Sequence, residues 1–421
     1  MKFIVIGGGL AGVPTAWYLL QAGHEVVLVD RAEALAAEGS HANGAILHAG
    51  NGEPWNSPAV VGQLLRWLGR EDSPLLLRPG QLPNLIGWGL RFLWHSRREP
   101  WQEGMTVNTR LAVYSRQQMD ALARELGSGW DQARRGSLKI CRTQESLATA
   151  ATLAPRLREL GIEVELLDRT GVLAAEPALV EAGDDIVGAS HFPQDQSGDP
   201  CRFCRLLGER LIAGGGELVL GARVSHLERD GDRIIGVHTD QGVLRGDRYV
   251  LAAGADAPLL AGPVGVHLPI RPVKGYAATL PVGERRGAPH APIIDDDRKV
   301  VMTRLGERLR VAGMAEFAGH DRSIRQGRVD AVVRNALASF PTYAASVDPA
   351  AIEPWACLRP LPVDGRPMIG PTPLRNLFLN AGAGHLGWTI AAGAGRLAAD
   401  LAAGQSPEID PAGVSLDRFG G

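Results

Sequence analysis

The glycine pattern near the N-terminus constrains the fold of this chain more than any other feature. A short apolar run ends at Gly7 and opens the pattern G-x-G-x-x-G, formed by Gly7, Gly9 and Gly12, and a helical pattern follows. In such a unit the first glycine permits a tight turn, the second lets backbone approach a pyrophosphate, and the third lets helix and strand pack closely. A second apolar run delivers Asp30 eighteen residues after Gly12, where a carboxylate can hold a ribose. The unit predicts a bound dinucleotide rather than a glycine turn without a ligand.

Composition limits the remaining classes. A chain of 421 residues is expected to divide into two domains, because single cores stop growing at roughly 250–300 residues. A net charge of −2 argues against a nucleic-acid partner, which requires a basic face. Four cysteines in a chain of this length do not form a disulfide framework and favour a reducing, cytoplasmic location. No signal peptide or membrane span is expected.

The alternation of apolar runs predicts an α/β (α+β) protein. We expect a Rossmann-type dinucleotide-binding domain plus a second, substrate-binding domain built on a mixed, largely antiparallel sheet. The first domain is expected to be discontinuous, over residues 1–75, 185–260 and 350–421. The second is expected over residues 76–184 and 261–349.

Local signals place several elements. Residues 107–126 have the pattern of a long helix, and residues 136–141 that of a strand. Asp199 before Pro200 predicts a helix start, with an N-cap and a proline at the first helical position. Residues 229–232 have the composition of a hairpin turn.

A second G-x-G-x-x-G, formed by Gly382, Gly384 and Gly387, precedes the last helical pattern. No strand follows that could present a ribose-binding acid, so a second nucleotide site would lack half of its unit. The loop is better explained as backbone that approaches the cofactor bound at the N-terminus.

These motifs together resemble one family. The glycine start, the loop over residues 40–45, the run over residues 250–255, Leu358-Arg359-Pro360 and the final glycine loop occur in this order in the D-amino-acid oxidase superfamily of FAD-dependent flavoproteins. Within it the chain is most similar to the bacterial D-amino acid dehydrogenase (small subunit) type. The resemblance covers essentially the whole chain.

The resemblance implies FAD as cofactor and assigns residues to its parts. Departures from the relatives occur at Gly44, Ala45, Ala383 and His385, so the loops that meet the flavin ring are rewritten here. The cofactor-binding residues implied are Gly7, Gly9, Leu10, Ala11 and Gly12 at the pyrophosphate; Asp30 and Arg31 at the ribose; Ser40, His41, Asn43, Gly44 and Ala45 along the ribityl and ring end; Val224 at the adenine; Ala253 and Gly254; and Gly384, Leu386, Gly387 and Thr389 under the ring.

The same resemblance implies the chemistry. A neutral amine gives its α-hydrogen as hydride to the flavin, and the cofactor performs the hard step. The protein must clamp the substrate carboxylate, for which a planar guanidinium is well suited, and Arg359 stands at the family's position for this role. Tyr276 either donates to the same carboxylate or packs in the core. His48, Glu53 and His385 are further candidates to face the substrate, and no metal is required.

The cysteines raise two alternatives to simple packing. In the sarcosine oxidase branch a cysteine at the position of Cys357 bonds covalently to the flavin; we expect non-covalent FAD, because Leu358-Arg359-Pro360 follows the non-covalent branch. Cys201 and Cys204 form C-x-x-C, which suits redox or zinc chemistry. No matching second pair is present, so we expect them to be structural.

The partners and the reaction follow from the resemblance. We expect oxidative deamination of a D-amino acid to an imino acid and then a 2-oxo acid, with electrons passed to a quinone or other carrier. The alternative is a flavoenzyme for a cyclic or N-substituted amino acid (D-hydroxyproline, an opine or sarcosine), either alone or with partner subunits. The tryptophan-rich residues 83–101 are a lid, a basic-aromatic surface for peripheral membrane association, or core. The sequence leaves all three open.

Overall fold

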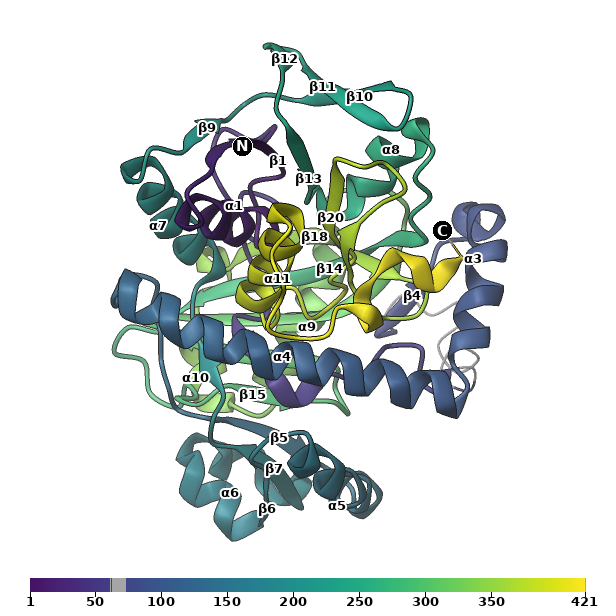
Figure 1. Ribbon diagram of the computed structural model, residues 1–421. Coiled ribbons are helices and arrows are strands. Elements are labelled where there is room, and N and C mark those ends of the chain that lie inside the picture. Colours follow the sequence, from purple (N-terminus) through teal and green to yellow (C-terminus); the bar gives the residue numbers. More distant parts are fainter. Residues whose placement is uncertain (61, 63–72, 421) are drawn as a thin grey trace.

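The computed structural model describes residues 1–60, 62 and 73–420. It contains two main sheets that meet at the centre of the molecule, with the long helix α4 (Arg98–Leu126) running across them (Figure 1). The mixed α/β class and the Rossmann-type domain expected from the sequence are confirmed.

The first sheet is parallel except at one edge, and we call it the parallel sheet. Its neighbouring strands occur in the order β19-β20-β13-β1-β2-β9, and only β19 is antiparallel. Helices α1 (Gly12–Gln21), α7 (Pro200–Ala213) and α11 (Ala391–Ala403) accompany it. Its strands are β1 (Lys2–Ile6), β2 (Glu25–Val29), β9 (Glu217–Val219), β13 (Arg248–Leu251), β19 (Met368–Pro371) and β20 (Leu377–Ala381).

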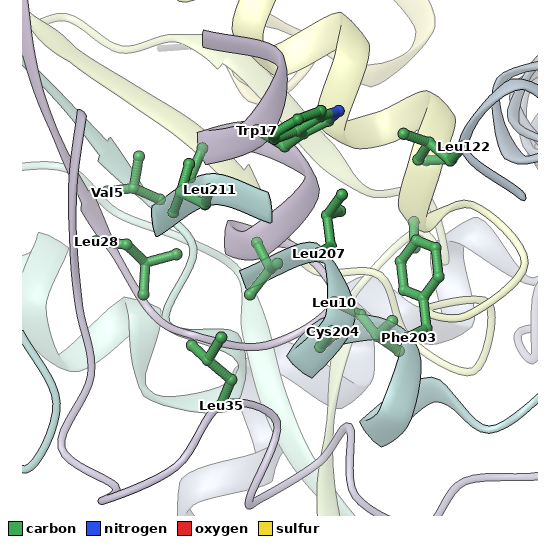
Figure 2. Close-up of a cluster of buried hydrophobic side chains, with 14 of the residues drawn as sticks. Val5, Leu10, Trp17, Leu28, Leu35, Leu122, Phe203, Cys204, Leu207 and Leu211 are labelled. Atoms are coloured by element: carbon green, nitrogen blue, oxygen red, sulfur yellow. The ribbon is translucent and has the colours of Figure 1, made fainter. Parts of the chain in front are cut away.

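The core between this sheet and its helices is apolar. Figure 2 shows Leu10 and Trp17 near α1 packed with residues of α7, among them Leu207 and Cys204. Cys204 is fully buried in this cluster, and burial raises its thiol pKa well above the usual value. Asp199 caps α7 by accepting from the Cys201 and Arg202 N–H groups, as the sequence predicts.

The second sheet is larger and mostly antiparallel, and we call it the mixed sheet. Helix α9 (Gln326–Leu337) packs on one of its faces. Its order is β18-β14-β17-β16-β15-β5-β7-β6, with β4 beside β17. The strands are β4 (Leu75–Leu77), β5 (Ser137–Cys141), β6 (Glu165–Asp168), β7 (Gly188–Phe192), β14 (Ile270–Pro281), β15 (Ile293–Asp295), β16 (Val300–Leu305), β17 (Arg308–Phe317) and β18 (Glu353–Pro362).

Smaller elements complete the fold. The strands β10 (Val224–Asp230), β11 (Arg233–Thr239) and β12 (Gly242–Leu244) form a separate sheet at one end, and β3 (Ile46–Leu47) pairs with β8 (Gln196–Ser197). The other helices are α3 (Leu82–His95), α5 (Gln144–Glu159), α6 (Arg169–Ala175), α8 (Ala257–Ala261) and α10 (Pro341–Ser346). Among the described residues, no helix combines the length and apolar character that crossing a bilayer requires.

The structure differs from the sequence-based expectations at three points. The strands β7 and β18 pair within the mixed sheet, although the proposed division assigns their residues to the dinucleotide-binding domain. Both strands pair with strands that are distant in the sequence, and such partners cannot be recognised from the local residue pattern. Helix α4 begins at Arg98 rather than near residue 107. Pro100 lies in its first turn, where proline is tolerated, so it does not break the helix.

Candidate active site

The glycine turn after β1 is sterically tight. A Cβ atom added at Gly12 would lie 1.7 Å from the Gly7 carbonyl oxygen, and one at Gly7 would lie 2.4 Å from the Ala252 carbonyl oxygen. Gly7 also has a positive φ of 118°. Only glycine fits these positions, so the turn brings the end of β1 directly onto the start of α1.

The N-terminus of α1 is open to an anion. No side chain caps it, and its first turn has no acidic residue. Ser40 accepts a hydrogen bond from the Leu10 N–H at 3.0 Å, which holds the loop after β2 against this turn. The free N–H groups and the helix dipole together favour a phosphate at such a position.

Asp30 lies at the end of β2, beside the glycine turn. Its carboxylate accepts from the Gly8 N–H at 2.5 Å and from the Ala32 N–H at 2.8 Å. Arg31 is held away by ion pairs to Glu38 and Asp256. Asp30 therefore has the more suitable position for a ribose, while Arg31 ties neighbouring loops together.

One large cavity runs from this turn into the space between the two sheets. Its volume is about 1260 Å³, larger than the roughly 300–1,000 Å³ of a typical small-ligand pocket. Most residues assigned from the sequence line it: Gly7, Gly9, Leu10, Ala11, Asp30, Arg31, Ser40, Asn43, Gly44, His48, Glu53, Val224, Ala253, Gly254, Tyr276, Arg359, Gly384, His385, Gly387 and Thr389.

Four assigned residues do not line the cavity. Gly12 packs against Gly7 as described above, and Leu386 is buried in a neighbouring apolar cluster. The His41 ring lies 4.3 Å from the Trp355 ring, measured between centroids. Ala45 has a positive φ of 57°, and its N–H donates to Asn43 Oδ1 at 2.8 Å. These residues shape the loops that surround the cavity.

Arg359 lies on β18 with its side chain at the cavity. A Cβ atom at Gly275 on β14 would lie 2.4 Å from Arg359 Cζ, so Gly275 leaves the space that the guanidinium fills. One guanidinium N–H group donates to the Met314 carbonyl oxygen at 2.8 Å, and the group lies 5.4 Å from the centre of the Trp55 ring. Among the described residues Arg359 has no carboxylate partner, and burial lowers its pKa. The cation is available to a ligand anion.

Tyr276 faces away from Arg359. Successive residues of a strand point to opposite faces, and Gly275 faces Arg359, so Tyr276 points to the α9 side. Its hydroxyl donates to Glu316 at 2.5 Å, and its ring belongs to the apolar core there. Of the two roles that the sequence leaves open, this geometry favours core packing over a bond to substrate.

Two histidines lie at the cavity wall. His385 stacks on Trp55, and its Nε2 lies 3.3 Å from the Asn51 carbonyl oxygen. Burial lowers the pKa of His385 to about 4, so this ring is neutral near pH 7. His48 is 2% exposed and pairs through Nδ1 with Asp195 at 2.6 Å.

Comparison with known proteins identifies the family. The family model described as FAD dependent oxidoreductase matches residues 2–401. The D-amino acid dehydrogenase of Paramagnetospirillum magneticum is 44% identical over 422 aligned residues, which cover 100% of this chain and 99% of that protein. The D-amino acid dehydrogenase of Rhizorhabdus wittichii is 39% identical over the full length of both. The chain belongs to the FAD-dependent oxidoreductase family.

Solved structures share the fold. Glycine oxidase from Geobacillus kaustophilus superposes with a TM-score of 0.78 at 21% identity, covering 99% of both chains. L-Proline dehydrogenase from P. horikoshii has a TM-score of 0.75 at 17% identity, covering 96% of this chain and 94% of that one. At such identities the likeness establishes architecture and not substrate.

FAD is the cofactor of this family, and the residues present fit it. The open α1 terminus would hold the pyrophosphate and Asp30 a ribose, and the cavity continues past Ser40 to the loop of Gly384 and Gly387. The second glycine pattern thus borders the same cavity as the first, as the sequence predicts.

Several cavity residues have no signal in the sequence. Trp55 contacts both Arg359 and His385. Lys139 on β5 and Asp296, which directly follows the neighbouring strand β15, form an ion pair of 2.7 Å. They come from segments far apart in the chain and match no motif. The pairing of β5 with β15 brings Lys139 and Asp296 together.

The cysteines show no metal or disulfide chemistry. All four are free, and no cluster of three or more metal-ligating side chains occurs within the described part of the chain. Cys357 lies on the same face of β18 as Arg359. Burial raises its thiol pKa, which disfavours the thiolate that a covalent bond would require.

Proposed function

We propose that this protein oxidises the α-carbon of a D-amino acid, giving an imino acid that water hydrolyses to a 2-oxo acid. The family and the full-length similarity to proteins named D-amino acid dehydrogenase support this reaction. Bound FAD supplies the two-electron oxidant.

The observation that carries the proposal is the guanidinium of Arg359, which pairs with no carboxylate among the described residues. A cation with no acidic partner inside a cavity is costly unless a ligand anion completes it. An arginine fork binds a carboxylate through two parallel hydrogen bonds. Trp55 and the Met314 carbonyl oxygen hold the fork in place. This arrangement orients an amino acid by its carboxylate, with its α-carbon toward the cavity wall of Gly384 and Gly387.

We further propose that the electrons pass to a quinone or similar carrier at a membrane surface, and that helix α3 meets this surface. One side of α3 borders the cavity through Trp88 and Phe92, which are nearly buried. Its other side exposes large apolar side chains, and α3 stands at the outer edge of the molecule (Figure 1). These are Leu82 (47% exposed), Ile86 (63%), Leu90 (66%) and Trp94 (61%).

The charge around α3 supports an anionic surface as partner. Residues 73–98 contain four arginines and no acidic residue. Arg91, Arg97 and Arg98 are exposed, and Arg97 lies 3.6 Å from the centre of the Trp94 ring. A helix with an apolar side flanked by arginines binds in the plane of an anionic bilayer. We therefore propose that the protein is cytoplasmic and peripheral on the inner face of the membrane.

Anaerobic bleaching of the bound flavin tests the reaction. The purified chain is mixed with a panel of D-amino acids, L-amino acids, proline derivatives, opines and sarcosine, and the flavin absorbance is followed. We expect one or more D-amino acids to bleach it and their L-enantiomers to leave it yellow. Bleaching only by a cyclic or N-substituted amino acid would replace the substrate class. A requirement for added proteins would indicate partner subunits.

A further inference from the structure

Four charged side chains form a closed set of ion pairs at the cavity, which we call the charge ring. Arg31 donates to Glu38 Oε1 at 2.7 Å and to Asp256 Oδ2 at 2.6 Å. Arg322 pairs with the same two carboxylates, at 2.7 Å from Asp256 Oδ2 and 3.6 Å from Glu38 Oε2. Each cation therefore contacts both anions. All four residues line the cavity.

The charge ring joins the two walls of the cavity. Arg31, Glu38 and Asp256 belong to segments that follow the strands β2 and β13 of the parallel sheet. Arg322 lies in the segment that follows β17 of the mixed sheet. Since residues on both sides line the cavity, their contact closes the cavity at this place.

The segment that carries Arg322 is anchored to the mixed sheet. Lys274 on β14 is fully buried, and its ammonium donates to Asp321 Oδ2 at 2.7 Å and to the Ser323 carbonyl oxygen at 3.0 Å. These two bonds flank Arg322 on both sides. The Arg322 guanidinium thus reaches the opposite wall from a fixed segment, and separation of the walls has to break its contacts.

The charge ring lies beside the position expected for FAD. Asp30, the candidate for the ribose contact, directly precedes Arg31, and Ser40 lies two residues after Glu38. Asp30 and Ser40 line the same cavity. A cofactor that extends from the start of α1 to Arg359 would pass between the two walls that the ring connects.

The other charged groups near the ring make different contacts. His320 Nε2 lies 3.4 Å from Asp256 Oδ1, which adds a third partner to this carboxylate. Arg325 pairs with Glu316 and Asp321 instead, each at 3.4 Å. Within the described part of the chain, Arg322 is therefore the cation from the mixed-sheet side that reaches both carboxylates of the opposite wall.

We propose that the charge ring holds the walls of the cavity together over bound FAD and so limits release of the cofactor. The proposal goes beyond the reaction, because it holds for any substrate and requires only that FAD is bound without a covalent bond. Single exposed ion pairs contribute little, whereas a network of charges contributes more. Salt screens such charges, so FAD should leave faster as the ionic strength rises.

The rate of FAD release from Arg322→Gln tests the proposal. The FAD-loaded protein is diluted into buffer without flavin, and released FAD is followed by its fluorescence. Arg322→Gln loses both ion pairs to the opposite wall, so we expect release at least about fivefold faster, which corresponds to about 1 kcal/mol. Added salt should accelerate release from the wild type more than from this variant, because the variant has already lost part of the network.

Asp256→Asn distinguishes closure of the walls from direct binding of FAD by the arginines. If Arg31 and Arg322 served to bind the FAD pyrophosphate, removal of the Asp256 carboxylate would free both guanidinium groups and slow the release. The proposal requires the opposite result, because Asp256 holds the two arginines of opposite walls together. We expect release at least about fivefold faster, as for Arg322→Gln.

The control is Arg134→Gln, which removes an exposed ion pair of 2.7 Å to Asp120 outside the cavity lining. It should release FAD at the wild-type rate. Wild-type release from both Arg322→Gln and Asp256→Asn would overturn the proposal, and so would slower release from Asp256→Asn. If a variant does not fold, the wild type still decides, because release that does not depend on salt would also overturn it. An absence of substrate bleaching would refute the proposed function without affecting this test.

Discussion

Arg359 carries the proposed substrate contact at the scale of the single residue. Replacing it with alanine removes a charge-assisted pair from a desolvated site, and truncating one such partner costs about 2–5 kcal/mol. We expect Arg359→Ala to raise the apparent substrate constant at least about a hundredfold, because 2.7 kcal/mol corresponds to that factor. Steady-state kinetics with a dye acceptor measures it.

The matched control for this change is Arg245→Ala, because the Arg245 side chain is 63% exposed and is not part of the cavity lining. It should leave the kinetics unchanged, and both variants should retain FAD. Loss of flavin from Arg359→Ala, or an unchanged substrate constant, would show that Arg359 is not the clamp.

Cys357 is the candidate residue for a covalent bond to FAD. Its thiol pKa is raised by burial, so little thiolate is present to attack a flavin methyl group. We expect acid precipitation to give a colourless pellet and a yellow supernatant. A yellow pellet that turns white in Cys357→Ala would establish a covalent bond instead.

At the scale of the element, helix α3 exposes several large apolar side chains to solvent. We expect the double variant Ile86→Glu and Leu90→Glu to lose at least tenfold in binding to vesicles of mixed neutral and anionic phospholipid, because carboxylates would enter the apolar boundary and face anionic lipid. Co-sedimentation measures the bound fraction, and added salt should lower wild-type binding.

The double variant Val180→Glu and Ile212→Glu is the control, because these side chains are 60% and 55% exposed on other elements. It should bind vesicles as the wild type does. Dye-linked activity should be unchanged in all variants. Equal vesicle binding by the α3 variant would refute the surface, and a change in oligomeric state would assign it to a second copy of the chain.

At the scale of the whole molecule, the acceptor distinguishes a dehydrogenase from an oxidase. We expect quinone analogues and dyes to reoxidise the reduced protein far faster than air does, in keeping with the relatives named dehydrogenase. Stopped-flow reoxidation compares the two directly. Hydrogen peroxide formed at the dye-linked rate would contradict this expectation.

Local sequence determined the dinucleotide turn, the start of α7 and the fold class. Gly7 and Gly12 are required by contacts within one strand–turn–helix unit, and Asp199 caps the helix that immediately follows it. Such features depend on neighbours in the chain, so spacing alone reveals them. The resemblance to the family points to Arg359, and the structure places this residue at the cavity.

Only the tertiary structure decided which side chains share the cavity. Successive residues of β14 point to opposite faces of the sheet. Gly275 faces Arg359, so Tyr276 points toward α9. Asp256 pairs with Arg31 and Arg322, which are 225 and 66 residues away in the sequence. Neither strand register nor long-range pairing is encoded in a short motif, since both follow from the packing of the whole chain.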